Sequence, residues 1–101
     1  MTMEKFREER KLGFVLSTLH AGSALKLWHN LAARAQKGDE AFFIFPGGKL
    51  GEPFRNSIYK LVNSSNIDGL ISWASSISGS VSLHEVEEFH NRFNKIPVVT
   101  I

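Results

Sequence analysis

Short apolar runs alternate along this chain with stretches whose apolar residues recur every three or four positions. Runs of this kind suit strands buried on both faces of a sheet, and the recurring stretches suit amphipathic helices. The runs predict strands at 13–16, 41–45, 68–73 and 97–101. The stretches between them predict helices at 23–37, 54–63 and 82–93. Because strand and helix alternate throughout, we expect an α/β fold with a parallel sheet and right-handed crossovers.

The expected sheet is doubly wound, with four strands in the spatial order 2-1-3-4. The chain would wind one way from the first strand to the second and then return past the first strand. The right-handed rule then places the helix at 23–37 on one face and the two later helices on the other.

Each predicted helix has an expected buried face and expected end signals. The expected inward residues are Ala24, Leu25, Trp28, Leu31, Ala32 and Ala35, then Ile58, Leu61 and Val62, then Leu83, Val86, Phe89 and Phe93. Gly38 suits a glycine at the end of the first helix, and Ser82 with Glu85 forms a capping box at the start of the last. The stretches 46–53 and 74–80 are expected to be loops.

The length of 101 residues allows one domain, which we place at 11–101, preceded by a tail or linker at 1–10. The formal charge of +2 gives no basic footprint for nucleic acid. There is no cysteine, so thiolate chemistry and thiolate metal sites are excluded. The charged N-terminus does not suit a signal peptide, and no apolar run reaches the roughly 20 residues of a membrane helix. We therefore expect a cytoplasmic chain without a membrane partner.

Enzyme signatures do not fit these residues. His84 and Glu85 open a zinc-protease motif, but Glu88 stands where its second histidine is required. His84 and His90 lie six residues apart and would point to different sides of a helix. We expect no metal and no cofactor. Cradling of a phosphate by Gly47 and Gly48 stays an alternative, because their loop follows a strand.

Polar residues gather where the predicted strands end, and parallel sheets bind ligands outside those carboxyl ends. The candidate ligand-binding residues are Ser17, Thr18, His20, Gly47, Gly48, Trp73, Ser75 and Ser76. Hydroxyl and imidazole groups beside one indole suit a small polar ligand. Two alternatives stay open, since Trp73 could pack in the core or under a loop, and His20 could be a solvated loop residue.

Four segments together resemble the ligand-binding region of the lactose-repressor family and its periplasmic sugar-binding relatives. They are Gly13–Ser17, Phe45–Gly48, Asn66–Ile71 and Ile96–Ile101. The resemblance covers residues 11–101 and implies a partial N-terminal lobe, half of a type I periplasmic-binding-protein-like fold. The Pro-Gly-Gly loop, with Ile58–Val62 ahead of Asp68-Gly69, is closer to sensor domains of bacterial diguanylate cyclases or histidine kinases.

The resemblance implies a small-molecule-sensing lobe of a bacterial signalling or transcription-regulatory protein, with a sugar-like or similar ligand and no catalysis of its own. Only ten residues precede the first strand, so the family's DNA-binding head does not carry over. The chain is also too short for the family's second lobe. The rival function is a protein-interaction or dimerisation module that binds no small molecule, and an enzyme on this type of sheet comes third. We expect the chain to self-associate under both the sensing and the interaction hypothesis. One sheet face would have only one helix to cover it, and the fourth strand would be an unpaired edge.

Overall fold

The computed structural model describes residues 10–20 and 22–101. The tail or linker predicted at 1–10 therefore lies, apart from Arg10, outside the described residues. Every predicted strand and helix of the domain at 11–101 falls on the part that is described, although Ala21 in the first loop does not.

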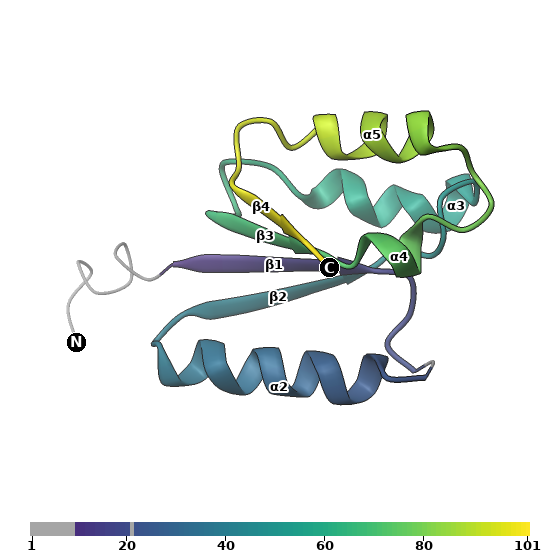
Figure 1. Cartoon of the computed structure of the whole chain (residues 1–101). Helices are drawn as coiled ribbons and strands as arrows, with labels where there is room; N and C mark the ends of the chain where they lie inside the picture. The colour runs from purple at the N-terminus through teal and green to yellow at the C-terminus, as the bar shows by residue number, and fades with distance from the viewer. Residues whose placement is uncertain (1–9, 21) are drawn as a thin grey trace.

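Four parallel strands form one sheet in the order β2-β1-β3-β4, which confirms the predicted topology (Figure 1). The strands are β1 (Lys11–Leu16), β2 (Ala41–Pro46), β3 (Gly69–Ser72) and β4 (Val98–Thr100). β1 is central and pairs with both neighbours, so Lys11 lies beside Ala41 on one side and Leu12 beside Gly69 on the other. The outer strands β2 and β4 form the two edges.

Helices cover both faces, as the right-handed crossovers require. The helix α2 (Ala24–Lys37) lies alone on one face, and the later helices lie toward the other (Figure 1). Those later helices are α3 (Pro53–Asn56), the 3-10 helix η1 (Ser57–Leu61), α4 (Ala74–Ile77) and α5 (Leu83–Asn91). The short α4 follows β3 directly, at the carboxyl ends of the strands.

The alternation of side chains along β1 divides the core into two layers. Phe14 and Leu16 are fully buried on the α2 side, while Val15 is fully buried on the α5 side. The buried residues of the α5-side layer are Val15, Tyr59, Val62, Ile67, Leu70, Ile77, Phe89, Phe93 and Ile96. This layer is larger than the α2-side one, whose buried members are Phe14, Leu16 and Ala24.

The helix predicted at 54–63 is wrong in its form. Pro53 starts a single α-helical turn, where its fixed φ is favourable, and the chain tightens into a 3-10 helix at Ser57. Side chains three residues apart share one side of a 3-10 helix, and here Tyr59 and Val62 form the inward side, while Leu61 is 60% exposed rather than buried. Tyr59 takes an inward position instead and is 2% exposed.

Three other local predictions are corrected by the structure. Leu25 and Leu83 are exposed, at 48% and 73%, and the first turn of α2 buries Ala24 instead. Gly38 has φ −84°, and the left-handed conformation after α2 belongs to Asp39 at φ 61°. The predicted loop at 74–80 begins with α4.

The capping of α5 by Ser82 is confirmed. Its hydroxyl accepts a hydrogen bond from the Glu85 amide at 3.3 Å. This bond satisfies one of the backbone donors that a helix start leaves without a partner.

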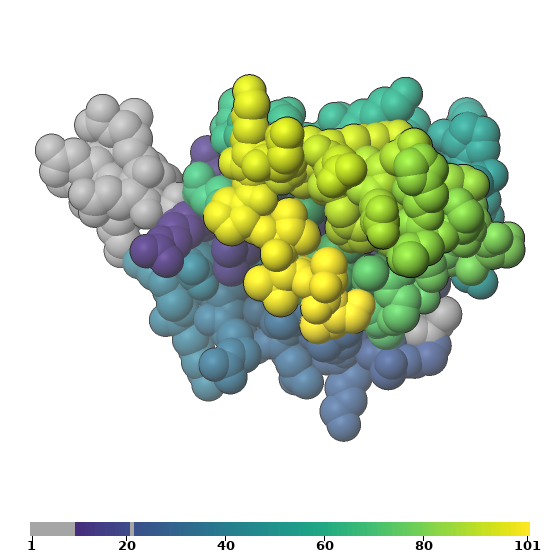
Figure 2. All heavy atoms as spheres, turned by 45° about the horizontal axis from the view of Figure 1, so that its top comes forward, coloured from purple at the N-terminus to yellow at the C-terminus, as the bar shows by residue number. Residues whose placement is uncertain are grey.

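The α2-side face is left partly uncovered at β4. Val99 lies beside Ile71, which packs on the α2 side, and Val99 is 63% exposed. Ile101 follows with the same alternation and is 49% exposed. Figure 2 shows this last segment, in yellow, at the surface of the molecule. Apolar side chains and a strand edge are therefore accessible in the same place.

Candidate ligand-binding site

The strand order locates a switch point between the carboxyl ends of β1 and β3. From β1 the chain crosses to β2 on one side, and after β2 it returns past β1 to β3 on the other. In open parallel sheets the crevice outside such a point is where ligands bind. Ser17 and Thr18 follow β1 at this point, and Trp73 follows β3.

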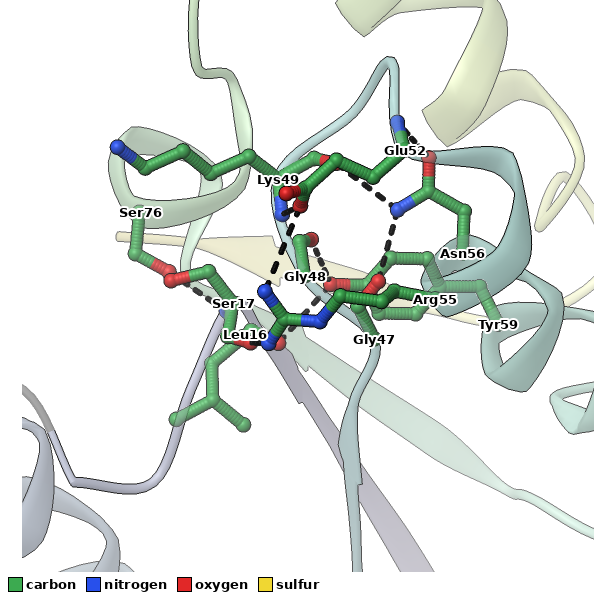
Figure 3. A network of polar contacts seen from close by, with 10 residues as sticks. All are labelled: Leu16, Ser17, Gly47, Gly48, Lys49, Glu52, Arg55, Asn56, Tyr59 and Ser76. Carbon is green, nitrogen blue, oxygen red and sulfur yellow. Dashed lines mark hydrogen bonds and ion pairs between the residues drawn. The ribbon is translucent and has the colours of Figure 1, made fainter.

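Ser17 is the centre of a polar network at this edge (Figure 3). Ser17 is 9% exposed, and its backbone amide donates to the Ser76 hydroxyl oxygen at 3.1 Å. Its carbonyl oxygen accepts from the Gly48 amide at 2.9 Å and from Nη2 of Arg55 at 3.2 Å. The structure thus brings together three residues predicted from the sequence, Ser17, Gly48 and Ser76, with one that was not predicted.

The Pro-Gly-Gly loop lies against the end of β1, and both of its glycines have close neighbours. A β-carbon on Gly47 would lie 2.6 Å from Cζ of Tyr59, a distance that no real β-carbon adopts. Gly48 has φ +76°, and a β-carbon there would lie 2.7 Å from Oε2 of Glu52. The two glycines therefore allow the loop to approach the Tyr59 ring and the Glu52 carboxylate.

The amides of this loop already have acceptors. Gly47 donates to the Leu16 carbonyl at 3.1 Å, and Gly48 donates to Ser17 as described. The next amide, that of Lys49, donates to Oε2 of Glu52 at 2.9 Å. A phosphate placed here would compete with these bonds, so the geometry favours a structural role for the loop over a phosphate cradle.

Asn56 fastens the loop from the end of α3. Its side-chain amide nitrogen donates to the Gly47 carbonyl at 2.7 Å and to the Lys49 carbonyl at 2.9 Å. Its side-chain oxygen accepts from the Glu52 amide at 3.2 Å. The edge of the candidate site is therefore held in one shape before any ligand arrives.

Tyr59 lies beneath the loop, with its hydroxyl at the end of β1. The hydroxyl oxygen lies 2.6 Å from the Gly48 carbonyl oxygen and 2.9 Å from that of Leu16, so its single proton serves two acceptors. Burial raises the pKa of Tyr59 well above its usual value, because the phenolate would lose its hydration. Tyr59 is therefore a neutral hydrogen-bond donor that joins the loop to β1.

The remaining predicted site residues lie around this network with different exposure. Thr18 is half-buried, and its hydroxyl lies 3.4 Å from the amide nitrogen of His20, which is exposed. Ser75 is exposed on α4. Trp73 is half-buried and packs against the α2-side core, while its amide donates to the Val15 carbonyl at 3.0 Å. Trp73 thus has a packing role, and its stacking on a ligand stays a prediction.

Arg55, Asn56 and Tyr59 belong to the site but were not found from the sequence. Arg55 and Tyr59 contact backbone carbonyls 38 and 43 positions away, and Asn56 contacts one nine positions away, so no motif in the sequence indicates these contacts. Arg55 adds a cation to the switch point, with its side chain 53% exposed and Nη1 3.6 Å from Oε2 of Glu52. A guanidinium in this position can bind a carboxylate or a sugar hydroxyl of a ligand.

A serine–histidine pair lies elsewhere in the fold. The Ser72 hydroxyl oxygen is 2.7 Å from Nε2 of His90, and Nδ1 of that ring is 2.9 Å from the Val86 carbonyl oxygen. A carbonyl only accepts, so Nδ1 carries the proton and Ser72 donates to Nε2. Ser72 is fully buried, and no substrate could reach its oxygen in this arrangement, so the pair joins α5 to β3.

Two further findings concern the described residues, and a third concerns the whole sequence. No helix among them is long and apolar enough to cross a membrane. Within the same ranges, no group of three or more histidine, aspartate or glutamate residues is arranged to hold a metal ion. Comparison with protein-family models, curated proteins and solved structures finds no match to this chain. The fold therefore defines a class, a doubly wound α/β domain, and the function has to be argued from the site.

Proposed function

We propose that this chain is a small-molecule-sensing lobe of a cytoplasmic bacterial signalling or transcription-regulatory protein, without catalysis of its own. One observation carries the proposal: polar groups of Ser17, Ser76 and Arg55 converge at the switch point between β1 and β3. This is the position at which sheets of this class bind ligands. The resemblance to the lactose-repressor family, carried by the strand and loop segments, agrees with that position.

In the proposed mechanism a ligand binds to the carboxyl ends of the strands and a second lobe closes over it. Hydroxyl groups at the ends of β1 and α4 would bind its polar atoms, and Arg55 would bind an acidic or hydroxyl group. Trp73 would offer the face of its indole to the ligand. The loop fixed by Asn56 and Tyr59 would keep these groups in place, which lowers the entropic cost of binding.

The proposal is tested by titrating isotope-labelled protein with monosaccharides and amino acids and following the backbone amide signals by NMR. We expect saturable shifts of the Ser17, Thr18 and Ser76 signals with at least one of these probes. Arg55→Gln and Trp73→Ala should weaken that binding. Ser80→Ala, a matched change in the loop after α4, should not.

The proposal fails if no probe shifts signals at this edge, or if both site variants bind the probe as tightly as the original chain. A cooperative melt of each variant confirms that it is folded. Unchanged affinity in folded Trp73→Ala alone would assign the indole to packing only.

A second function, a protein-interaction or dimerisation module, is favoured by a different observation. Val99 is exposed at the open β4 edge, and this apolar surface can contact another protein chain without a small molecule. The two functions can coexist, because this edge and the switch point use different residues. Sedimentation equilibrium, which measures self-association, tests this second function.

A further inference from the structure

A hollow lies toward the opposite end of the sheet from the candidate ligand-binding site. It has a volume of about 560 Å³ and lies beside β2, toward the amino ends of the strands. Its lining residues are Lys11, Phe43, Phe45, Lys60, Leu61, Asn63, Ser65, Asn66 and Ile67. We call it the β2 groove. None of its residues belongs to the switch-point network.

The floor of the β2 groove is apolar. Phe43 and Phe45 face away from α2, since their neighbours Phe42 and Ile44 pack on the α2 side. Phe43 is 44% exposed although it lies in the middle of a strand. Leu61, the last residue of the 3-10 helix, adds a second exposed apolar side chain at 60%. A ligand that covers both side chains would remove apolar surface from water.

The polar rim formed by the 61–67 loop is largely satisfied within itself. The side-chain nitrogen of Asn66 donates to the Leu61 carbonyl at 2.6 Å, and its oxygen accepts from the Asn63 amide at 3.0 Å. The side-chain oxygen of Asn63 accepts from both the amide and the hydroxyl of Ser65. The rim is thus a fixed wall, and few of its polar groups are left to bind a ligand.

The charge of the β2 groove is entirely positive. Its lining includes Lys11 and Lys60 and no carboxylate. Among the described residues, neither lysine forms an ion pair. Asp68 lies next to the start of β1, but its carboxylate accepts from the Lys11 backbone amide at 2.8 Å and is not part of the lining. The two ammonium groups are therefore available to an anion.

We propose that the β2 groove binds a small organic anion with an apolar body, such as an aryl carboxylate. Its body would lie on Phe43 and Leu61, and its carboxylate would pair with Lys60 and Lys11. The groove volume is in the range of pockets that hold small molecules. This site is separate from the switch point, so the proposal stands independently of the proposed sensing function.

The test is an NMR titration of the full chain with hydrocinnamate. Hydrocinnamyl alcohol, which keeps the body and loses the charge, and acetate, which keeps the charge and loses the body, are the matched probes. We expect saturable shifts of the Phe43, Leu61 and Ile67 amide signals with hydrocinnamate, and weaker binding of both other probes. The double variant Lys11→Gln/Lys60→Gln should weaken hydrocinnamate binding about tenfold, the combined effect of two exposed charge pairs.

Two further variants complete the design. Phe43→Ser should weaken binding through the loss of the floor, and Lys26→Gln, which removes an exposed lysine from α2, should leave it unchanged. Equal affinity of the double lysine variant and Lys26→Gln would overturn the proposal. So would hydrocinnamate shifts confined to the Ser17 and Trp73 signals, or no saturation up to tens of millimolar. Binding that appears only with an acidic aromatic peptide would assign the groove to a protein partner and equally overturn it.

Discussion

The Tyr59 ring lies face-on against the α-carbon of Gly47. A β-carbon at this glycine would lie 2.6, 2.7 and 2.8 Å from three atoms of the ring, and the ring's hydroxyl lies 2.6 Å from the next carbonyl oxygen, that of Gly48. The contact joins the loop after β2 to the 3-10 helix and, through the Leu16 carbonyl, to the central strand. Much of the shape of the candidate site depends on this one contact.

Gly47→Ala should therefore destabilise the fold. The added methyl group must displace a buried ring, and overpacking of this kind costs about 1–3 kcal/mol. Urea unfolding monitored by tryptophan fluorescence measures the change. Gly69→Ala is the matched control, because its β-carbon would meet Cδ2 of Leu12 at an ordinary 3.4 Å. Equal free energies of unfolding for the two variants would contradict the contact.

Tyr59→Phe should keep the ring and lose the hydroxyl. The Gly48 carbonyl then loses its short hydrogen bond in a buried position, which costs about 1–2 kcal/mol of folding free energy. The same unfolding assay measures it. In the double variant with Gly47→Ala the two losses should not add, because both changes act on the same ring. Strict additivity would show that the two residues act separately.

The stability of the protein should fall in alkaline solution because of Tyr59. Burial raises the pKa of its phenol, so above about pH 10 the unfolded chain releases the proton while the folded chain keeps it. Stability is full below that pH and then decreases by up to about 1.4 kcal/mol per pH unit until the folded group ionises.

Tyr59→Phe separates this effect from the titration of the lysines. The stability advantage of the original chain over this variant should be constant near neutral pH and shrink above about pH 10. Tyr59 is the single tyrosine of the chain, so the phenolate absorbance reports on it directly. An absorbance titration with an ordinary midpoint in the folded protein would contradict a buried phenol.

The chain should self-associate at micromolar concentration through the exposed surface at β4, most simply as a symmetric dimer. Val99→Lys should shift sedimentation equilibrium toward the monomer, because it places a charge in the contact. Leu83→Lys is the control, since Leu83 is 73% exposed on α5 and belongs to neither layer of the core. A monomeric original chain with a cooperative melt would refute the prediction, and so would equal effects of the two lysine substitutions.

The sheet was predictable because its information is local. A continuous apolar run such as 13–16 indicates a strand buried on both faces, and the handedness of crossovers then leaves few possible orders. The helix after Pro53 was not predictable in form. It tightens at Ser57, and the Tyr59 of this segment packs against Gly47 and donates to Leu16, contacts that no local pattern in 53–61 indicates.

The candidate site was predictable in position and incomplete in membership. Ser17 and Ser76 were found because polar residues at strand ends are visible in the sequence, and the structure connects them. Arg55 was missed because its partner, the Ser17 carbonyl, is a backbone group that every residue possesses. Contacts between a side chain and a remote backbone atom leave no signature at either position.

β1 pairs with a strand on each side, so it stays unpaired during translation until those strands have been synthesised. β1 leaves the ribosome before the other three strands, and its first partner, beginning at Ala41, is translated about 3 s later at a rate near 10 residues per second. Its other partner, beginning at Gly69, follows after about as long again. During synthesis the segment Phe14 to Leu16, which is fully buried in the fold, therefore lacks both partner strands. A chaperone that captures short apolar segments would find one here in the nascent chain, and would lose it once β3 has paired with β1.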